Sequence, residues 1–330
     1  MEVRVTVIGD TLGIGDLARL TGVPVRTIRF YCDEGVLTPL RSTGGHRRFG
    51  QDAVSRLDLV RRLRSLGLGL SSITAVLTGE SSLGEAVAAE RAGLDVELAA
   101  MAWRRASLRA VEQAGPADRA ARLELLAAVQ DGRAAHDVLV TFWRDRFPSP
   151  ITGQVLEMFL DVSAPPPPAD PTPDQVVAYA ELVALAGDRS LAVRLLQSAA
   201  ANRRMISSEV ALHDGVGDAC ATALPKVVAG EPPGPSPELE LFVATHAAVR
   251  DRRDTPEFRR ELLASVEVDR EPRMRRYWTD VRVVTAQPAS LGEAHTWLLD
   301  SLHLHNAGIT SEPRPAERRG DRSQVLIPGE

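Results

Sequence analysis

The stretch from Ile14 to Phe49, IGDLARLTGVPVRTIRFYCDEGVLTPLRSTGGHRRF, decides the fold of the front of the chain. Its first part predicts a helix from about Asp16 to Leu20, which Gly22 ends as a C-terminal glycine. Pro24 stands at a first-turn position where proline is tolerated, and the pattern after it predicts a second helix up to Gly35. Two short helices with a tight break between them are typical of a helix-turn-helix.

An Arg-rich hairpin is predicted directly after the second helix. Val36 to Leu40 begins a strand, Thr43–Gly45 forms a glycine turn, and His46–Phe49 returns as the second strand. This hairpin carries four basic side chains that are suited to contact with a phosphate backbone, namely Arg41, His46, Arg47 and Arg48. We therefore expect a basic wing beside the two helices.

Two further helices complete the predicted N-terminal domain. From Gln51 to Ser65 an apolar residue recurs at every third place, opposite several arginines, and Gly67 and Gly69 then break the pattern. A shorter helix is expected at about Leu70–Leu77. We place this winged helix-turn-helix domain at residues 12–79.

The composition favours a helical protein with more than one domain. A chain of 330 residues is long enough for two or three domains of about 100–200 residues each. A content of 44% apolar but only 4% aromatic residues favours a core built of Ala, Leu and Val over a β-sandwich. The expected fold class is all-α, with the hairpin wing as the exception.

The charge is distributed unevenly along the chain. A net charge of −5 alone argues against a nucleic-acid partner, but the distribution matters more than the sum. Residues 1–78 hold 11 of the 39 Lys and Arg residues and only 7 of the 44 acidic residues, so the front is basic and the remainder acidic. Lys226 is the single lysine.

Two cysteines, Cys32 and Cys220, are too few for a disulfide framework or a cysteine-rich metal site within one chain. No apolar run approaches the roughly 18–20 residues of a membrane span, and the first residues lack a signal-peptide pattern. We expect a soluble cytoplasmic protein with no membrane partner. His295, His303 and His305 are spaced poorly for a shared metal, so neither a metal nor a cofactor is expected.

A long helix is predicted from about Ser82 to Gln113, within a segment placed at residues 80–114. Apolar residues seven apart are typical of a helix that packs lengthwise on another helix. Leu98 adds a further apolar side chain to the same face. The pattern is not a full heptad repeat, because Glu90, Glu97 and Arg104 occupy the second apolar position. A short antiparallel pairing is favoured over an ordinary amphipathic helix, through Val87, Leu94, Leu98, Met101 and Leu108.

Helices are predicted through most of residues 115–308, including separate ones at about 204–215 and 218–229. The Pro-rich stretches at 164–173 and 230–237 cannot be helical and either separate sub-bundles or form loops within one bundle. Residues 309–330 have the composition of a disordered tail.

The stretch quoted at the start, continued to Leu77, resembles the MerR family of transcriptional regulators. The resemblance rests on IGDLARLTGV, VRTIRFYCDEGVL, STGGHRRF and LVRRLRSLGLGLSSITAVL, in this order, over about a fifth of the chain. Cys32 departs from the family, which has an acidic residue there, and GGHRRF departs from a wing that usually carries tyrosines.

The resemblance implies a homodimer on double-stranded promoter DNA. The recognition helix of each subunit would enter the major groove, and the long helix would pair antiparallel with its twin. An effector would then bend and untwist the DNA so that RNA polymerase, an indirect partner, can read it. The expected DNA contacts are Arg26, Thr27, Arg29 and Tyr31 of the recognition helix with Arg41, His46, Arg47 and Arg48 of the wing.

Three classes of function remain for the helical remainder. An enzyme is not expected, because no nucleophile elbow, phosphate loop, metal motif or paired-carboxylate spacing appears. A small organic effector in a pocket is favoured over a docked protein partner. The aromatic residues that could line such a pocket are Trp143, Phe159, Tyr179, Tyr277, Trp278 and Trp297.

Overall fold

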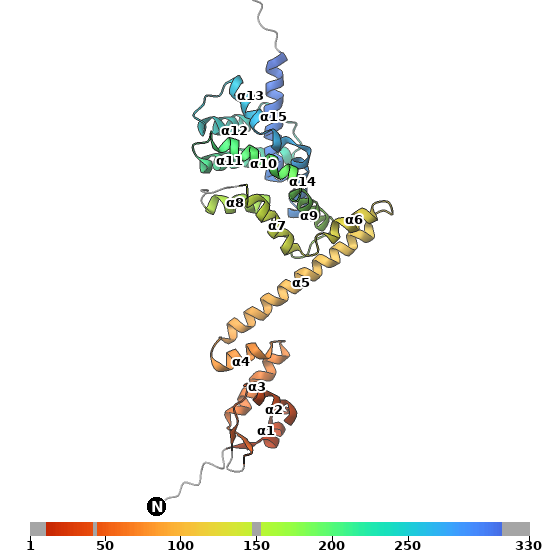
Figure 1. Cartoon of the computed structure of the whole chain (residues 1–330), viewed down its shortest axis with the longest axis vertical. Coiled ribbons are helices and arrows are strands. Elements are labelled where there is room, and N and C mark those ends of the chain that lie inside the picture. Colours follow the sequence, from red (N-terminus) through yellow and green to blue (C-terminus); the bar gives the residue numbers. More distant parts are fainter. Residues whose placement is uncertain (1–10, 42–44, 147–152, 312–330) are drawn as a thin grey trace, which may run out of the picture. The chain divides into compact units, whose positions relative to one another are not determined.

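The computed structural model describes residues 11–41, 45–146 and 153–311 of the chain. The chain divides into two compact units between Ala99 and Ala100. Within the described ranges, no helix is long and apolar enough to cross a membrane. The first unit contains a small sheet and short helices, and the second is helical (Figure 1).

The first unit has the predicted order of helix, helix, wing and trailing helices. Its elements are β1 (Leu12–Gly13), α1 (Ile14–Thr21), α2 (Val25–Asp33), β2 (Leu40–Arg41), β3 (Arg47–Phe49), α3 (Asp52–Ser65) and α4 (Leu70–Thr78). One apolar core holds them together, and its fully buried side chains include Leu17, Ile28, Phe49, Leu57 and Ile73.

The sheet differs from the predicted hairpin in two respects. It has three antiparallel strands in the order β1-β3-β2, since Leu12 pairs with Phe49 on the side of β3 away from β2. The strand predicted from Val36 is wrong at its start, because Val36 and Leu37 are buried in the core within a turn. That turn uses Gly35 in the left-handed region, at φ 76°. The tip of the wing, residues 42–44, lies outside the described residues.

Several arginines of α3 stabilise the first unit instead of facing a partner. The Arg56 guanidinium donates to the carbonyl oxygens of Val36 and Leu77, each at 3.1 Å. Arg61 donates to the Thr21 carbonyl at 2.7 Å. Each guanidinium thereby satisfies carbonyls at the end of a helix or in a turn, where no backbone donor is in place.

A single long helix, α5 (Leu83–Gln113), follows, and it confirms the predicted helix at 82–113. Ser82 and Glu85 form a reciprocal cap at its start. The Glu85 backbone N–H donates to Ser82 Oγ at 3.2 Å, and the Ser82 N–H donates to Glu85 Oε2 at 2.8 Å. These hydrogen bonds lower the pKa of the Glu85 carboxyl.

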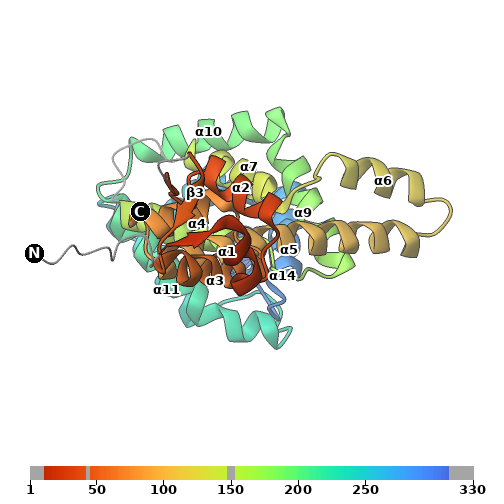
Figure 2. The same ribbon diagram turned by 90° about the horizontal axis from the view of Figure 1, so that it is seen from below.

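The second unit begins within α5 and continues through ten further α-helices and one 3₁₀-helix in its described residues. They are α6 (Arg119–Ala127), α7 (Gly132–Arg144), α8 (Gly153–Ser163), α9 (Pro173–Ala186), α10 (Arg189–Arg203), α11 (Glu209–Val228), α12 (Pro237–Ala248), α13 (Pro256–Ser265), η1 (Glu267–Arg270), α14 (Pro272–Thr285) and α15 (Leu291–Ser311). α6 folds back beside the C-terminal end of α5 (Figure 1, Figure 2).

Two hydrophobic cores lie within this unit. The first joins the end of α5 to α6, α7, α9 and α14, with Trp103, Leu139 and Tyr277 among its buried side chains. The second joins α11, α12, α13 and α15 around Phe242 and Leu298. At its edge Lys226 Nζ lies 2.8 Å from Glu238 Oε2 and beside the Trp297 ring.

The two helices predicted at 204–215 and 218–229 are one helix, α11, so this prediction is wrong. Ser208 caps its start by accepting from the Ala211 N–H at 3.2 Å. Gly215, the predicted end of the first of these helices, lies inside α11, and a Cβ there would meet Thr245 of α12 at 2.6 Å. The glycine therefore allows two helices to approach closely and does not end one.

The predicted disordered tail, residues 309–330, also starts too early. α15 continues to Ser311, so its last three residues lie inside the range given to the tail. The remaining residues, 312–330, lie outside the described part of the chain.

Gly292 lies where α15 meets α14, and a Cβ on it would overlap the indole of Trp278. We expect Gly292→Ala to destabilise the second unit by about 1–3 kcal/mol, the usual cost of overpacking. Chemical denaturation followed by tryptophan fluorescence measures this directly, because all four tryptophans lie in residues 100–330.

Gly217→Ala is the matched control, since a Cβ on this exposed glycine of α11 meets nothing within 4 Å. We expect it to be neutral or to stabilise by up to about 1 kcal/mol, because alanine is the better helix former. Equal unfolding midpoints for Gly292→Ala and the unmodified chain would contradict the close approach.

Candidate nucleic-acid interface and ligand cavity

The outer face of α2 presents cationic side chains. α2 buries Ile28 and Tyr31 against the core, so residues on its opposite side face outward. Arg26 and Arg29 are exposed, and neither has an ion-pair partner among the described residues. Phe30, which was not among the predicted contacts, is 46% exposed on the same face.

The other two predicted contacts of α2 are less accessible. Thr27 is half-buried. Tyr31 is only 9% exposed and packs in the core of the first unit, with its ring 6.0 Å from that of Phe30. Its ring therefore stabilises the fold of α2, while Arg26 and Arg29 offer the accessible cationic groups.

The wing arginines are partly engaged within the unit. Arg47 forms an ion pair with Asp33 of α2 at 3.0 Å. Arg48 donates to the carbonyl oxygen of Thr11 at 2.8 Å and to its hydroxyl at 3.2 Å. His46 is exposed, while the side chain of Arg41 lies outside the described part. The wing is therefore anchored to α2 by Arg47 and to the segment before β1 by Arg48.

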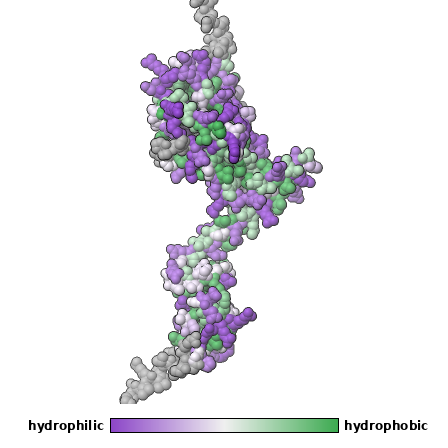
Figure 3. All heavy atoms as spheres, in the orientation of Figure 1, coloured by the Kyte–Doolittle hydropathy of each residue, from purple (hydrophilic) through white to green (hydrophobic). Residues whose placement is uncertain are grey.

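The five residues predicted to form a dimer seam are all exposed on α5. Their exposed fractions run from 39% for Val87 to 66% for Met101. The others are Leu94, Leu98 and Leu108. Figure 3 shows apolar surface along this helix. Large apolar side chains exposed in a row are typical of an interaction surface.

A cavity of about 400 Å³ lies between the two cores of the second unit. This volume is within the range of roughly 300–1,000 Å³ that small-molecule sites occupy. Its walls are mostly apolar and include Val155, Met158, Leu212, Val266 and Met274. The cavity can therefore hold an organic molecule of modest size.

Three of the six aromatic residues predicted for a pocket line this cavity: Trp143, Phe159 and Trp278. The indoles of Trp143 and Trp278 stack with centroids 5.9 Å apart and planes at 21°. Phe159 lies edge-on to Trp143 at 5.3 Å. The predicted pocket residues therefore include the aromatic part of the cavity lining.

The other three aromatic residues do not line the cavity. Tyr179 is fully buried and donates from its hydroxyl to the Pro165 carbonyl at 2.9 Å. Tyr277 donates to the Ser163 carbonyl at 2.5 Å and accepts from Trp143 Nε1 at 2.7 Å. Trp297 donates from Nε1 to the Glu231 carbonyl at 2.8 Å. Each polar atom is used within a core, so these side chains stabilise packing.

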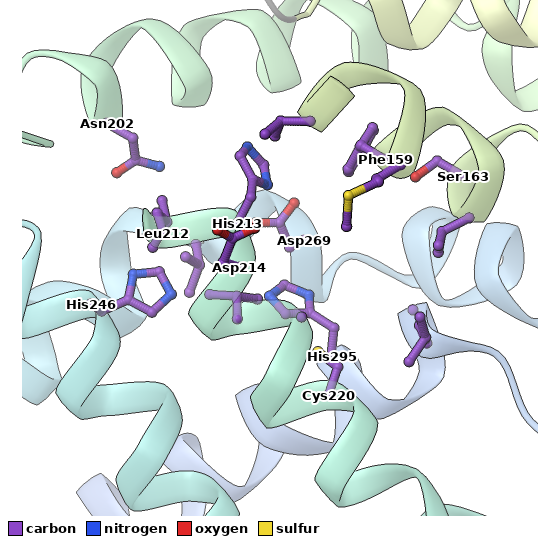
Figure 4. A pocket seen from close by; sticks show the side chains of 18 of the residues that line it. Phe159, Ser163, Asn202, Leu212, His213, Asp214, Cys220, His246, Asp269 and His295 are labelled. Carbon is purple, nitrogen blue, oxygen red and sulfur yellow. The ribbon is translucent and has the colours of Figure 1, made fainter. Parts of the chain in front are cut away.

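Polar groups from four elements meet at the cavity (Figure 4). They are His213 of α11, His246 of α12, Asp269 of η1 and His295 of α15. None of these four residues is among the six predicted for the pocket. Three of the seven histidines of the chain line this cavity, although they are far apart in the sequence. Only the scarcity of histidine could have drawn attention to them beforehand.

Burial controls the protonation of these groups. It lowers the pKa of His295 to about 4 and that of His246 well below the usual value, with the Arg250 charge adding to the latter. Burial also lowers the pKa of His213. Burial raises the pKa of Asp269 to about 7. Near neutral pH the imidazoles are therefore uncharged, and Asp269 is divided between its two forms.

No group of three or more His, Cys, Asp or Glu side chains in the described ranges is arranged to hold a metal ion. Cys220 lines the cavity, and burial raises the pKa of its thiol to about 12. The thiol is protonated at neutral pH and serves as part of an apolar wall.

The family comparison concerns the first unit. Residues 12–80 match the family described as MerR HTH family regulatory protein. The nodulation protein NolA of a Bradyrhizobium species is 35% identical over 97 residues, which is 29% of this chain and 41% of NolA. The HTH-type transcriptional regulator CueR of Escherichia coli is 38% identical over 60 residues, 18% of this chain and 44% of CueR.

A third relative is the HTH-type transcriptional activator SoxR homolog of Chromobacterium violaceum, 36% identical over 68 residues, 21% of this chain and 46% of that protein. The chain spans less than half the length of these curated relatives. No solved structure matches it.

We expect Arg29→Gln to weaken binding to the DNA that precedes its own gene by about 5- to 100-fold. The exposed guanidinium of Arg29 has the geometry to donate two hydrogen bonds to a guanine edge, worth about 1–3 kcal/mol. Fluorescence anisotropy with a labelled duplex at fixed salt measures the change. Arg91→Gln, on the exposed surface of α5, removes the same charge and is the control. Equal losses in both variants would rule out a specific contact.

We also expect acid to destabilise the second unit through His295. An exposed histidine of the unfolded chain titrates near 6.5, whereas His295 in the fold titrates at about 4. The unfolded chain therefore binds this proton first, and stability is lost as pH falls from 6.5 to 4, by at most about 3 kcal/mol.

In His295→Gln this contribution is absent, so its free energy of unfolding falls less steeply over the same interval. Denaturation at pH 7, 5.5 and 4, followed by tryptophan fluorescence, gives both slopes. Parallel slopes for the two proteins would show that His295 is not held neutral.

Proposed function

Residues 12–80 form a MerR-family helix-turn-helix domain, and from this premise we propose that the whole chain is a DNA-binding transcription regulator that works as a homodimer. The observation that carries the proposal is the exposed pair Arg26 and Arg29 on the outer face of α2 in a fold of this family. Two unpartnered guanidinium groups one helical turn apart suit the edge of a major groove.

The wing supports the same orientation on DNA. Arg47 ties it to Asp33 at the end of α2, so the helix and the wing are positioned together. His46 and the wing arginines then face the backbone next to the groove, where contacts position the domain without reading sequence. RNA polymerase would be an indirect partner, reached through the shape of the promoter.

Dimerisation through α5 is supported by the exposed row Val87, Leu94, Leu98, Met101 and Leu108. Exposure of five large apolar side chains on one helix is unfavourable in water, at about 25 cal/mol for each Å² left uncovered. An antiparallel twin helix covers them and sets the spacing of two recognition helices, which a two-fold DNA site requires.

The helical unit is proposed to hold a small organic effector. Its cavity of about 400 Å³ with an aromatic wall supports a small ligand over a docked protein. Occupation of a space between two cores changes how those cores pack. Through the dimer, this change would bend or untwist the promoter, with part of the specificity residing in the stiffness of the DNA.

Leu98→Glu tests the dimer. Leu98 is 63% exposed on α5, and a carboxylate in a buried seam is costly. We expect the variant to sediment as a monomer and to bind the promoter duplex at least tenfold more weakly, because each monomer contacts one half-site only. Leu123→Glu on α6, where Leu123 is 58% exposed, is the matched control and should remain a dimer. A monomeric unmodified chain that still binds the duplex tightly would overturn the proposal.

A further inference from the structure

The cavity of the helical unit has a carboxylate in its lining on the side of η1. Asp269 lies in the short helix η1 and lines the cavity. Its backbone N–H donates to the Val266 carbonyl at 3.1 Å, but its side chain has no hydrogen-bond or ion-pair partner among the described residues. Asp269 is half-buried and lines the open space of the cavity, so its carboxylate is available to a ligand there.

Of the other groups that line the cavity, Arg250 alone carries a positive charge at pH 7, and it forms no ion pair with Asp269 among the described residues. His213, His246 and His295 face the same cavity, and their lowered pKa values keep all three neutral at pH 7. Arg250 lines the cavity too, but its guanidinium donates to Nδ1 of His246 at 2.9 Å and to the His246 carbonyl at 3.1 Å. Asp214 adds a second carboxylate on α11.

The walls favour a cation as well. Trp143, Phe159 and Trp278 contribute aromatic rings to the lining, and Figure 4 labels Phe159 and Asp269 among the residues around the cavity. The face of an aromatic ring attracts a positive charge, most strongly for tryptophan. A cavity with aromatic walls and the Asp269 carboxylate between them therefore complements an apolar body that carries an ammonium group.

We propose that the cavity binds a small apolar or aromatic molecule with one protonated amine, whose N–H groups donate to the carboxylate of Asp269. This proposal names the chemical class of the effector. It rests on the proposed function only in so far as binding of the molecule is taken to regulate transcription. The amine pairs with the Asp269 carboxylate, and the apolar body fills the space between the two cores.

An anionic ligand is a poorer match for the same cavity. It would have to pair with the Arg250 guanidinium, whose two terminal nitrogens already donate to His246 and to the side-chain oxygen of Asn202. Because the pKa of His295 is about 4, only roughly one molecule in a thousand carries a proton on it at pH 7. Asp269, with a pKa of about 7, is ionised in a large fraction of molecules without any such uptake.

Three probes with the same apolar body test the ligand class: 2-naphthylmethylamine, 2-naphthylmethanol and 2-naphthoic acid. Isothermal titration calorimetry with the full chain at pH 7.5 measures the affinity of each. We expect the amine to bind at least about tenfold more tightly than the alcohol, as a charge-assisted hydrogen bond implies, and the acid to bind most weakly.

Asp269→Asn should reduce the preference for the amine over the alcohol to within about twofold. Asparagine matches the protonated carboxyl in size, so the variant is expected to keep the fold. Glu267→Gln is the control, because Glu267 is an exposed carboxylate on the same short helix outside the cavity. It should leave the preference for the amine intact.

Lowering the pH to 5.5 gives an independent readout. Protonation of Asp269 should weaken binding of the amine by about tenfold, while binding of the alcohol, which has no charge to pair with the carboxylate, should change little. The inference is overturned if the acid or the alcohol binds as tightly as the amine, if none of the three binds, or if Asp269→Asn keeps the preference.

Promoter binding by the same preparations, without probe, separates this inference from the proposed function. Loss of amine selection with intact DNA binding would remove the ligand class only. Intact amine selection without any promoter binding would remove the regulator and leave the ligand site.

Discussion

The helical unit depends on the junction at Trp278, where its two hydrophobic cores meet. The indole stacks on Trp143 on the side of the first core, and its backbone carbonyl accepts from the Ser290 hydroxyl at 2.9 Å. Gly292 lies against the same ring, so α15 approaches α14 as closely as a helix can. The ion pair between Arg282 and Glu293, at 3.0 Å, fastens these helices at their solvent side. The cores are thereby joined firmly at one end.

The cavity remains beside this junction because its lining includes polar side chains that cannot merge into an apolar core. Imidazole and carboxyl groups need hydrogen-bond partners or solvent when they are enclosed, and collapse of the two cores around them would leave them without either. In this account His213, His246, Asp269 and His295 keep the two cores apart at the cavity, besides the ligand role proposed for Asp269. The same residues that make the fold less stable keep a volume available between its halves.

The sequence was sufficient for features that depend on local spacing and insufficient for those that depend on packing. Gly22, Pro24 and the arginines of the wing predicted the helix-turn-helix, because caps and turns are set within a few residues. Val36 was misassigned to a strand because apolar residues in a buried turn have the same pattern as a strand start. Gly215 was taken for a break because its contact with Thr245 lies thirty positions away.

The cavity was the least predictable part for the same reason. Its polar groups come from α11, α12, η1 and α15, and no single helix shows a polar stripe that would reveal them. Aromatic content located Trp143, Phe159 and Trp278 but equally suggested Tyr179, Tyr277 and Trp297, whose polar atoms bond within the cores. Residue type alone does not separate the two sets. The hydroxyl of a tyrosine or the indole N–H of a tryptophan can form a hydrogen bond inside a core or face a cavity.

The absence of lysine from residues 1–78 limits how this protein can be controlled. Its cationic surface for DNA consists of guanidinium groups, which keep their charge at every physiological pH and are not acetylated. The one lysine, Lys226, is in the other unit and is paired with Glu238. Acetylation, which neutralises the DNA-facing charge of many lysine-rich proteins, has no substrate on this surface. If this surface binds DNA as proposed, lysine acetylation is not a means of weakening that binding.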